Sequence, residues 1–347
     1  MNTKLLDTNT ICKVMEGSHA YGTVTPSSDV DMRGIFCAEP ISIRTPFFPV
    51  KEIEVAEDED TKFYELNHFM RLLMDQNPNI VQVLWVRDSD VLKSTPAYEL
   101  LRERRKSFLS SKIAFTTSGY AHALLKRIRG HNKWINNPQP IEPPTHTNYI
   151  RLKQWFDPSV KILPNEFNIM NYADSHRLIH YGDYLYGMYE WKNFNMFRPD
   201  GSIKDNFDGE RSELCSPTAI VKFNRAKWLE DKDIHTNYWN WKTNRNESRS
   251  VLEEEYGFDT KHAMHLVRLM RMGLEVLETG EVNVFRSDAS ELLDIRNGSM
   301  TYEEILNYAD EMDNSIKSAY EKTELSKKPN IKLAAKSILE VQDLLWS

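Results

Sequence analysis

The chain has 347 residues, enough for two domains of ordinary size. A net charge of -7 argues against a general nucleic-acid coat, so any contact with a polynucleotide has to be a local patch. No long apolar run and no apolar signal core near residue 1 is present, which predicts neither a membrane span nor a signal peptide. The cysteines lack paired spacing, which predicts a reduced, cytoplasmic compartment: Cys12, Cys37 and Cys215.

A strand followed by a glycine opens the N-terminal region. Residues 11–15 read as a short apolar strand, and Gly17 and Ser18 follow within the run GSHAYGT. Glycine is needed where the backbone must approach a phosphate closely, and the free N–H groups of a helix start favour an anion. We therefore predict a phosphate-binding turn at Gly17 and Ser18.

Two aspartates follow this turn. Asp29 and Asp31 enter a second predicted strand, 30–38, so both carboxylates point to one face, roughly 7 Å apart along the chain. Oxygen-rich sites suit Mg²⁺ or Mn²⁺, and two such ions about 4 Å apart can promote in-line phosphoryl displacement on a nucleoside triphosphate. Either half of this pattern alone is more typical of ordinary loops, but the combination in this order favours a functional site.

The residues GSHAYGT followed by SDVDMRG resemble the signature of the DNA polymerase β-type nucleotidyltransferase superfamily, in the branch with RNA-ligase-associated and phage-encoded members. Further similarity lies at 64–66, 77–78, 261–270 and 277–282, whereas 131–215 carries no recognised motif. The resemblance implies a small palm-like mixed sheet and a third carboxylate on a neighbouring strand. It also favours RNA repair with an RNA end as acceptor and RNA or tRNA bound through a local patch, while a protein side chain or a small hydroxylated molecule stays open as acceptor. A phage-encoded member would act in the host cytoplasm.

Two acids compete for that third position. Asp60 enters a predicted strand over 60–66 and is our choice, while Glu65 is the rival. The acidic run 57–60 could equally be a solvated loop. Arg33 shares the face of Asp31 and could either clamp a phosphate or pair with one of the aspartates.

A helix predicted over 259–279 is the second informative element. Its apolar stripe faces a core, and Lys261, His265 and Arg268 line the opposite side at helical spacing. The row could be a solvated face, but flanking apolar residues favour contacts to the triphosphate or another substrate. We expect neither His262 nor His265 to hold zinc, since neither has cysteine or histidine partners at zinc-binding spacing.

Basic and aromatic residues alternate over 221–249, as a surface for single-stranded nucleic acid would require. Acidic residues dilute the positive charge, so a helix of mixed charge is the favoured explanation.

The organisation predicted is α+β, with a nucleotidyltransferase domain over 1–110, a mainly helical domain over 111–347, and a long loop or linker at 131–165. Helices are expected over 65–75, 96–106, 112–129, 171–191, 218–255, 259–279, 302–324 and 331–345.

The pattern as a whole predicts a Mg²⁺- or Mn²⁺-dependent, cytoplasmic nucleotidyltransferase in which Asp29, Asp31 and Asp60 hold metal. Gly17, Ser18, Arg33 and the row Lys261, His265, Arg268 would bind the nucleotide. A metal-dependent phosphohydrolase using the same carboxylates and a non-catalytic RNA-binding protein remain as alternatives.

Overall fold

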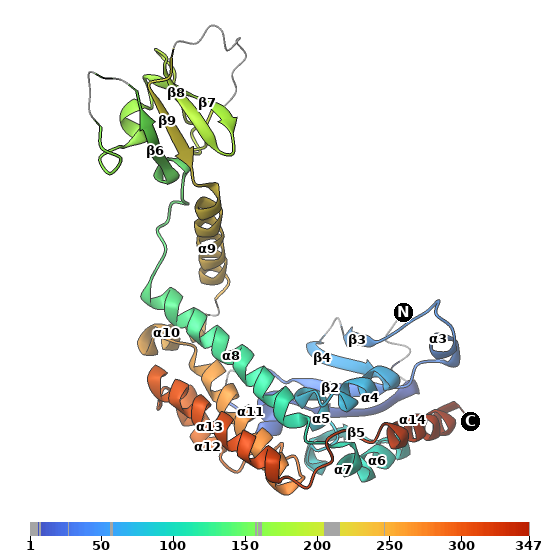
Figure 1. Cartoon of the computed structure of the whole chain (residues 1–347). Helices are drawn as coiled ribbons and strands as arrows, with labels where there is room; N and C mark the ends of the chain where they lie inside the picture. The colour runs from blue at the N-terminus through green and yellow to red at the C-terminus, as the bar shows by residue number, and fades with distance from the viewer. Residues whose placement is uncertain are drawn as a thin grey trace. The chain divides into compact units, whose positions relative to one another are not determined.

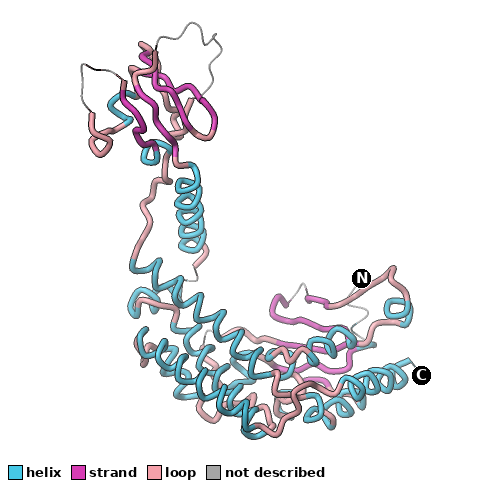
Figure 2. Tube along the Cα trace, in the orientation of Figure 1, coloured by secondary structure: helices cyan, strands magenta, loops and turns pink. Residues whose placement is uncertain are grey.

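The computed structural model describes residues 6, 8–26, 28–55, 58–156, 158, 162–204, 216–245 and 247–346 (Figures 1 and 2). The chain forms two compact units, Met1–Asn136 with Glu247–Ser347, and Asn137–Asn246. This division differs from a boundary at residue 110, because the second unit is inserted into the first instead of following it. Cys215 lies outside the described residues.

A five-stranded sheet with the order β3-β4-β2-β1-β5 forms the centre of the first unit. Only the pair β2 and β4 is parallel, so the sheet is mixed as predicted. The strands are β1 Thr10–Met15, β2 Met32–Phe36, β3 Glu52–Val55, β4 Asp58–Glu65 and β5 Val91–Lys93. The helices associated with them are α2 Gly17–Tyr21, α3 Pro40–Arg44, α4 Leu66–Met74, α5 Pro78–Gln82, η1 Asp88–Asp90, α6 Pro96–Glu103, α7 Arg105–Phe108 and α14 Ile331–Trp346.

A layer of longer helices completes the first unit: α8 Ile113–Asn136, α10 Glu247–Tyr256, α11 Thr260–Thr279, α12 Ala289–Arg296 and α13 Tyr302–Lys322. Helix α11 is buried on two sides, since Leu269 and Val276 pack in the core of the sheet while Leu266 and Met270 pack among the helices. Helix α11 therefore joins the two cores.

The second unit contains an antiparallel sheet with the order β6-β9-β8-β7. Its elements are η2 His146–Tyr149, β6 Ile150–Trp155, η3 Ile169–Tyr172, β7 His176–Gly182, β8 Leu185–Glu190, β9 Ala219–Phe223 and the helix α9 Arg225–Thr243.

The helices predicted over 171–191 and across 218–223 are therefore wrong. Residues 176–190 form a hairpin whose turn residues Asp183 and Tyr184 both have positive φ, as a type I′ turn requires. Residues 219–223 alternate buried and half-buried side chains, which is the period of a strand with one face in the core. The prediction of an α+β chain with a small mixed sheet near its start is confirmed.

None of the helices in the described part of the chain is long and apolar enough for a membrane span.

Candidate active site

The turn at Gly17 lies directly against Asp31. Gly17 has φ +62°, and a β-carbon at this position would overlap the Asp31 carboxylate. The neighbouring Glu16 N–H donates to the Asp31 carbonyl at 2.9 Å. Only glycine allows this approach without strain, so the sequence brings the start of α2 and an acidic side chain together.

Asp60 lies beside Asp31 at the same end of two parallel strands. The register pairs Met32 with Thr61, so each aspartate immediately precedes a paired residue. Burial raises the pKa of the Asp31 carboxyl, and the carboxylates of Asp60 and Asp29 add to the rise, while the Arg33 guanidinium opposes it. Three acids therefore share one electrostatic environment.

These three aspartates are not drawn into one tight cluster. Asp29 and Asp60 are exposed and Asp31 is half-buried. Among the described residues, the three do not form a group whose carboxylate oxygens all lie within 4.8 Å of one another. Any cation shared between them would need water or substrate oxygens as further ligands.

Glu65, the rival third acid, lies at the far end of β4. It pairs with Phe36, five residues from Asp60, which is about 16 Å along a strand. Its carboxylate is the N-cap of α4 and accepts hydrogen bonds from the N–H groups of Asn67 and His68 at 2.7 and 3.3 Å. The structure does not bring Glu65 together with Asp31.

Arg33 forms an ion pair, but its partner is neither aspartate. Its Nε lies 2.9 Å from Glu16 Oε2, and its Nη1 donates to the main-chain carbonyls of Met32 and Asp60, each at 2.9 Å. The alternative in which Arg33 pairs with one of the aspartates is thus corrected, because its ion-pair partner is Glu16. Arg33 holds the ends of β1, β2 and β4 together.

Glu16 is a site residue that sequence reasoning missed. It is buried, and burial raises the pKa of its carboxyl to about 7 despite the nearby Arg33 guanidinium. The available signal was an acidic residue at the end of an apolar strand, directly before the Gly-Ser turn.

Glu16→Gln should remove a pH dependence of stability. The pKa of Glu16 in the folded protein is raised above the usual 4.5. The contribution of the protonated acid to stability is therefore complete below pH 4.5 and is lost as the pH rises through about 7. The shift corresponds to about 3 kcal/mol. The free energy of unfolding, measured with urea at pH 5 and pH 8, should fall between the two pH values less in Glu16→Gln than in wild type, by about this amount. The exposed control Glu321→Gln should behave like wild type; equal pH dependence in all three proteins would contradict the assignment.

The row on α11 faces the sheet and is not a solvated face. Arg268 is only 5 % exposed, and its guanidinium lies 3.7 Å from the ring centre of Tyr21 in α2. Its Nε and Nη1 make no hydrogen bond to any described residue. Lys261 contributes positive charge at Asp31, and burial lowers the pKa of His265 well below its usual range, helped by the charges of Arg268 and Lys261.

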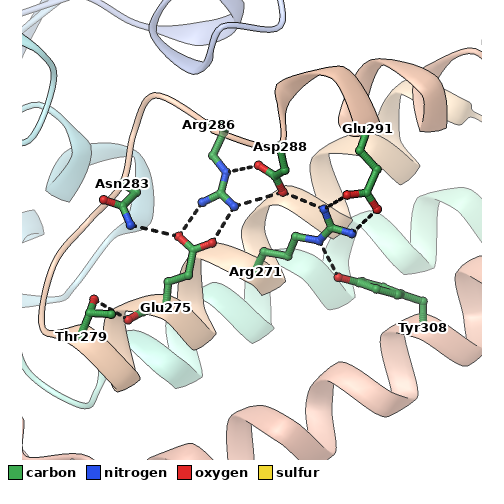
Figure 3. A network of polar contacts seen from close by, with 8 residues as sticks. All are labelled: Arg271, Glu275, Thr279, Asn283, Arg286, Asp288, Glu291 and Tyr308. Carbon is green, nitrogen blue, oxygen red and sulfur yellow. Dashed lines mark hydrogen bonds and ion pairs between the residues drawn. The ribbon is translucent and has the colours of Figure 1, made fainter.

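An ion-pair network fixes the segment after α11 (Figure 3). The guanidinium of Arg286 binds both carboxylate oxygens of Glu275 at 2.6 Å and Asp288 at 2.8 Å. The backbone N–H of Arg286 donates to the carbonyl of Tyr21 at 3.1 Å. Arg271 binds the other side of Asp288 at 2.7 Å, together with Glu291 and Tyr308. The network therefore connects α11, the loop that follows it and the end of α2.

Arg286→Ala should lower the free energy of unfolding by about 3 kcal/mol, because it removes a buried cation, leaves Glu275 without its ion pair and leaves Asp288 with Arg271 alone. Lys106→Ala is the matched control, since its pair with Glu281 is exposed and should contribute at most about 1 kcal/mol. Urea unfolding of both variants checks this, and equal losses would show that the network adds no more than a surface pair.

The aromatic residues over 221–249 pack within the second unit. Trp228 and Trp239 donate from Nε1 to the carbonyls of Pro144 and Pro140, both at 2.9 Å. Lys242 lies 5.3 Å from the ring centre of Trp239. The tryptophans of α9 thus bind the segment 140–144, which agrees with the predicted helix of mixed charge and accounts for much of the aromatic pattern.

Comparison with known proteins gives one family. Residues 3–137 match the family model described as RlaP, RNA repair pathway DNA polymerase beta family. The match spans the Gly17–Asp31 contact and Asp60 and ends at the close of α8. No curated protein and no solved structure matches the chain.

The resemblance to polymerase β-type nucleotidyltransferases is confirmed, and it suggests a nucleotidyltransferase-like role in RNA repair. Residues 3–137 of this chain are thus similar to the RNA repair pathway DNA polymerase beta family.

Proposed function

We propose that the protein transfers a nucleoside monophosphate from a nucleoside triphosphate to a hydroxyl acceptor, with pyrophosphate as the leaving group. One observation carries this proposal: a glycine turn of the kind that accepts a phosphate lies against Asp31, and Asp31 lies beside Asp60 on the parallel strand. A phosphate bound at this turn would lie next to the carboxylates, as nucleotidyl transfer requires.

Asp29, Asp31 and Asp60 would hold Mg²⁺ or Mn²⁺. The donor set fits, because it consists of carboxylate oxygens. Burial, with the carboxylates of Asp60 and Asp29, raises the pKa of Asp31, and a cation would favour its charged form. The spacing of the acids also fits Mg²⁺, which keeps several waters and substrate oxygens as ligands. The bound ions would activate the attacking hydroxyl and stabilise the leaving oxygen.

The triphosphate would lie between the start of α2 and the row on α11. The N–H groups of Gly17 and Ser18, as the first residues of a helix, have no acceptor within it. Since α2 is short, its N–H groups alone do not make a site. A second observation supports one: Arg268 is buried beside α2, and its Nε and Nη1 have no acceptor among the described residues. Burying guanidinium nitrogens without hydrogen-bond acceptors is costly, so an anionic ligand at this place would be favoured.

Arg268→Met and Lys261→Met should each weaken the binding of ATP about tenfold or more, since a charge-assisted hydrogen bond contributes roughly 1.5–3 kcal/mol. The loss should be smaller for AMP, which has fewer phosphates to contact. Isothermal titration calorimetry with both nucleotides measures this, with Lys126→Met on the exposed face of α8 as the control. Equal ATP affinity in all four proteins would remove α11 from the nucleotide site.

The acceptor proposed is an RNA end, such as that of a tRNA, which follows from the RNA repair description of the family. Release of pyrophosphate from each of the four nucleoside triphosphates, measured with Mg²⁺ or Mn²⁺ and with or without RNA, tests the proposal. RNA-stimulated, metal-dependent release supports it. Release of inorganic phosphate alone indicates a phosphohydrolase, and RNA binding without turnover of any nucleotide indicates a non-catalytic protein.

A further inference from the structure

A second group of metal-ligating side chains lies in the helical layer of the first unit. It comprises His131 near the end of α8, Asp259 at the N-cap of α11, and His262 in the first turn of α11. One donor atom from each residue lies within 4.8 Å of the others. The expectation that His262 lacks a histidine partner is therefore corrected, because α8 supplies one from a distant position in the sequence.

The distances converge on a single oxygen. His262 Nδ1 lies 2.6 Å and His131 Nδ1 lies 3.6 Å from Asp259 Oδ2. The other carboxylate oxygen of Asp259 accepts the backbone N–H of His262 at 2.9 Å and so caps the helix. Capping needs one oxygen only, so it does not explain why two imidazoles approach the second oxygen.

A fourth donor is close. Glu253 of α10 places Oε1 at 4.0 Å from His131 Nδ1. Both carboxylates are buried, Asp259 being 2 % and Glu253 5 % exposed. Buried acids grouped with imidazoles at this spacing suit a cation, since ligand atoms bonded to zinc at about 2.0–2.1 Å lie roughly 3.3 Å apart in a tetrahedron.

We propose that His131, Asp259 and His262 bind a zinc ion, with Glu253 as the fourth ligand. Mixed imidazole and carboxylate donors favour zinc over Mg²⁺, which prefers oxygen alone, so this site is chemically distinct from the one at Asp31. Its three helices include α8, which ends where the second unit begins in sequence, and α10, which starts where that unit ends. The ion would fasten together the two chain segments between which the second unit is inserted.

The test is zinc binding by the full chain after removal of metal with a chelator and dialysis. Titration with Zn²⁺ against a chromogenic chelator should give one tight site per chain in wild type. His131→Gln, His262→Gln and Asp259→Asn should each weaken it at least tenfold, because each removes one ligand. Asp259→Asn keeps a good N-cap residue and so separates loss of the ligand from loss of the helix start.

Two control variants locate the ion. His122→Gln, on the same helix but outside the cluster, and Asp31→Asn should both retain wild-type zinc affinity. Zinc should also raise the melting temperature of wild type and of these controls but not of the three ligand variants. Absence of zinc binding in wild type, or unchanged affinity in both His131→Gln and Asp259→Asn, would overturn the proposal, whatever the nucleotide chemistry proves to be.

Discussion

Asp29→Asn and Asp31→Asn are each expected to abolish nucleotidyl transfer while leaving the fold intact. Asparagine has the shape of aspartate, and loss of the charge at Asp31 removes both the cost of burying that charge and its repulsion by the carboxylates of Asp60 and Asp29. Since both acids would position the same metal cluster, the double variant should be hardly less active than either single variant. Pyrophosphate release under saturating nucleotide measures the effect.

The exposed control Asp310→Asn on α13 should keep full activity. Urea unfolding of the active-site variants should show stability equal to or above that of wild type. Substantial activity in Asp31→Asn would contradict the metal assignment.

Asp60→Asn is expected to cost orders of magnitude in turnover, as removal of a member of a catalytic unit does, whereas Glu65→Gln should leave turnover unchanged. Glu65 caps α4 at the far end of the strand, so its replacement should appear as a loss of about 1 kcal/mol in the free energy of unfolding. The two substitutions thus separate catalysis from stability on one strand. If both variants kept full activity, the third acid would lie elsewhere.

The sequence predicted the parts of the fold that local pattern determines. The strand before Gly17, the strand after Asp31 and the long helix over 259–279 appear with boundaries within a few residues of those expected. The sheet of the second unit was missed because its strands have only five to seven residues, too few for the period of a strand to be told from that of a helix. Only the pairing between strands distant in sequence, such as β6 with β9, distinguishes a strand from a helix here.

The same limit applies to the candidate site. Gly17 and Asp31 could be linked because they belong to one short motif, and the structure places them in contact. The contact of Arg268 with Tyr21 and the approach of His131 to Asp259 join residues more than a hundred positions apart. Helical periodicity gives the face on which such residues lie but not the partner that the face meets.

The most direct test of nucleotidyl transfer uses one nucleoside triphosphate labelled in parallel at the α- and the γ-phosphate. With Mg²⁺ and RNA, we predict that the α-label becomes attached to the acceptor and that the γ-label leaves in pyrophosphate. With Asp31→Asn, both labels should stay in the nucleoside triphosphate. Appearance of the γ-label as inorganic phosphate, with the α-label left in free nucleoside diphosphate, would contradict nucleotidyl transfer and assign the carboxylates to hydrolysis.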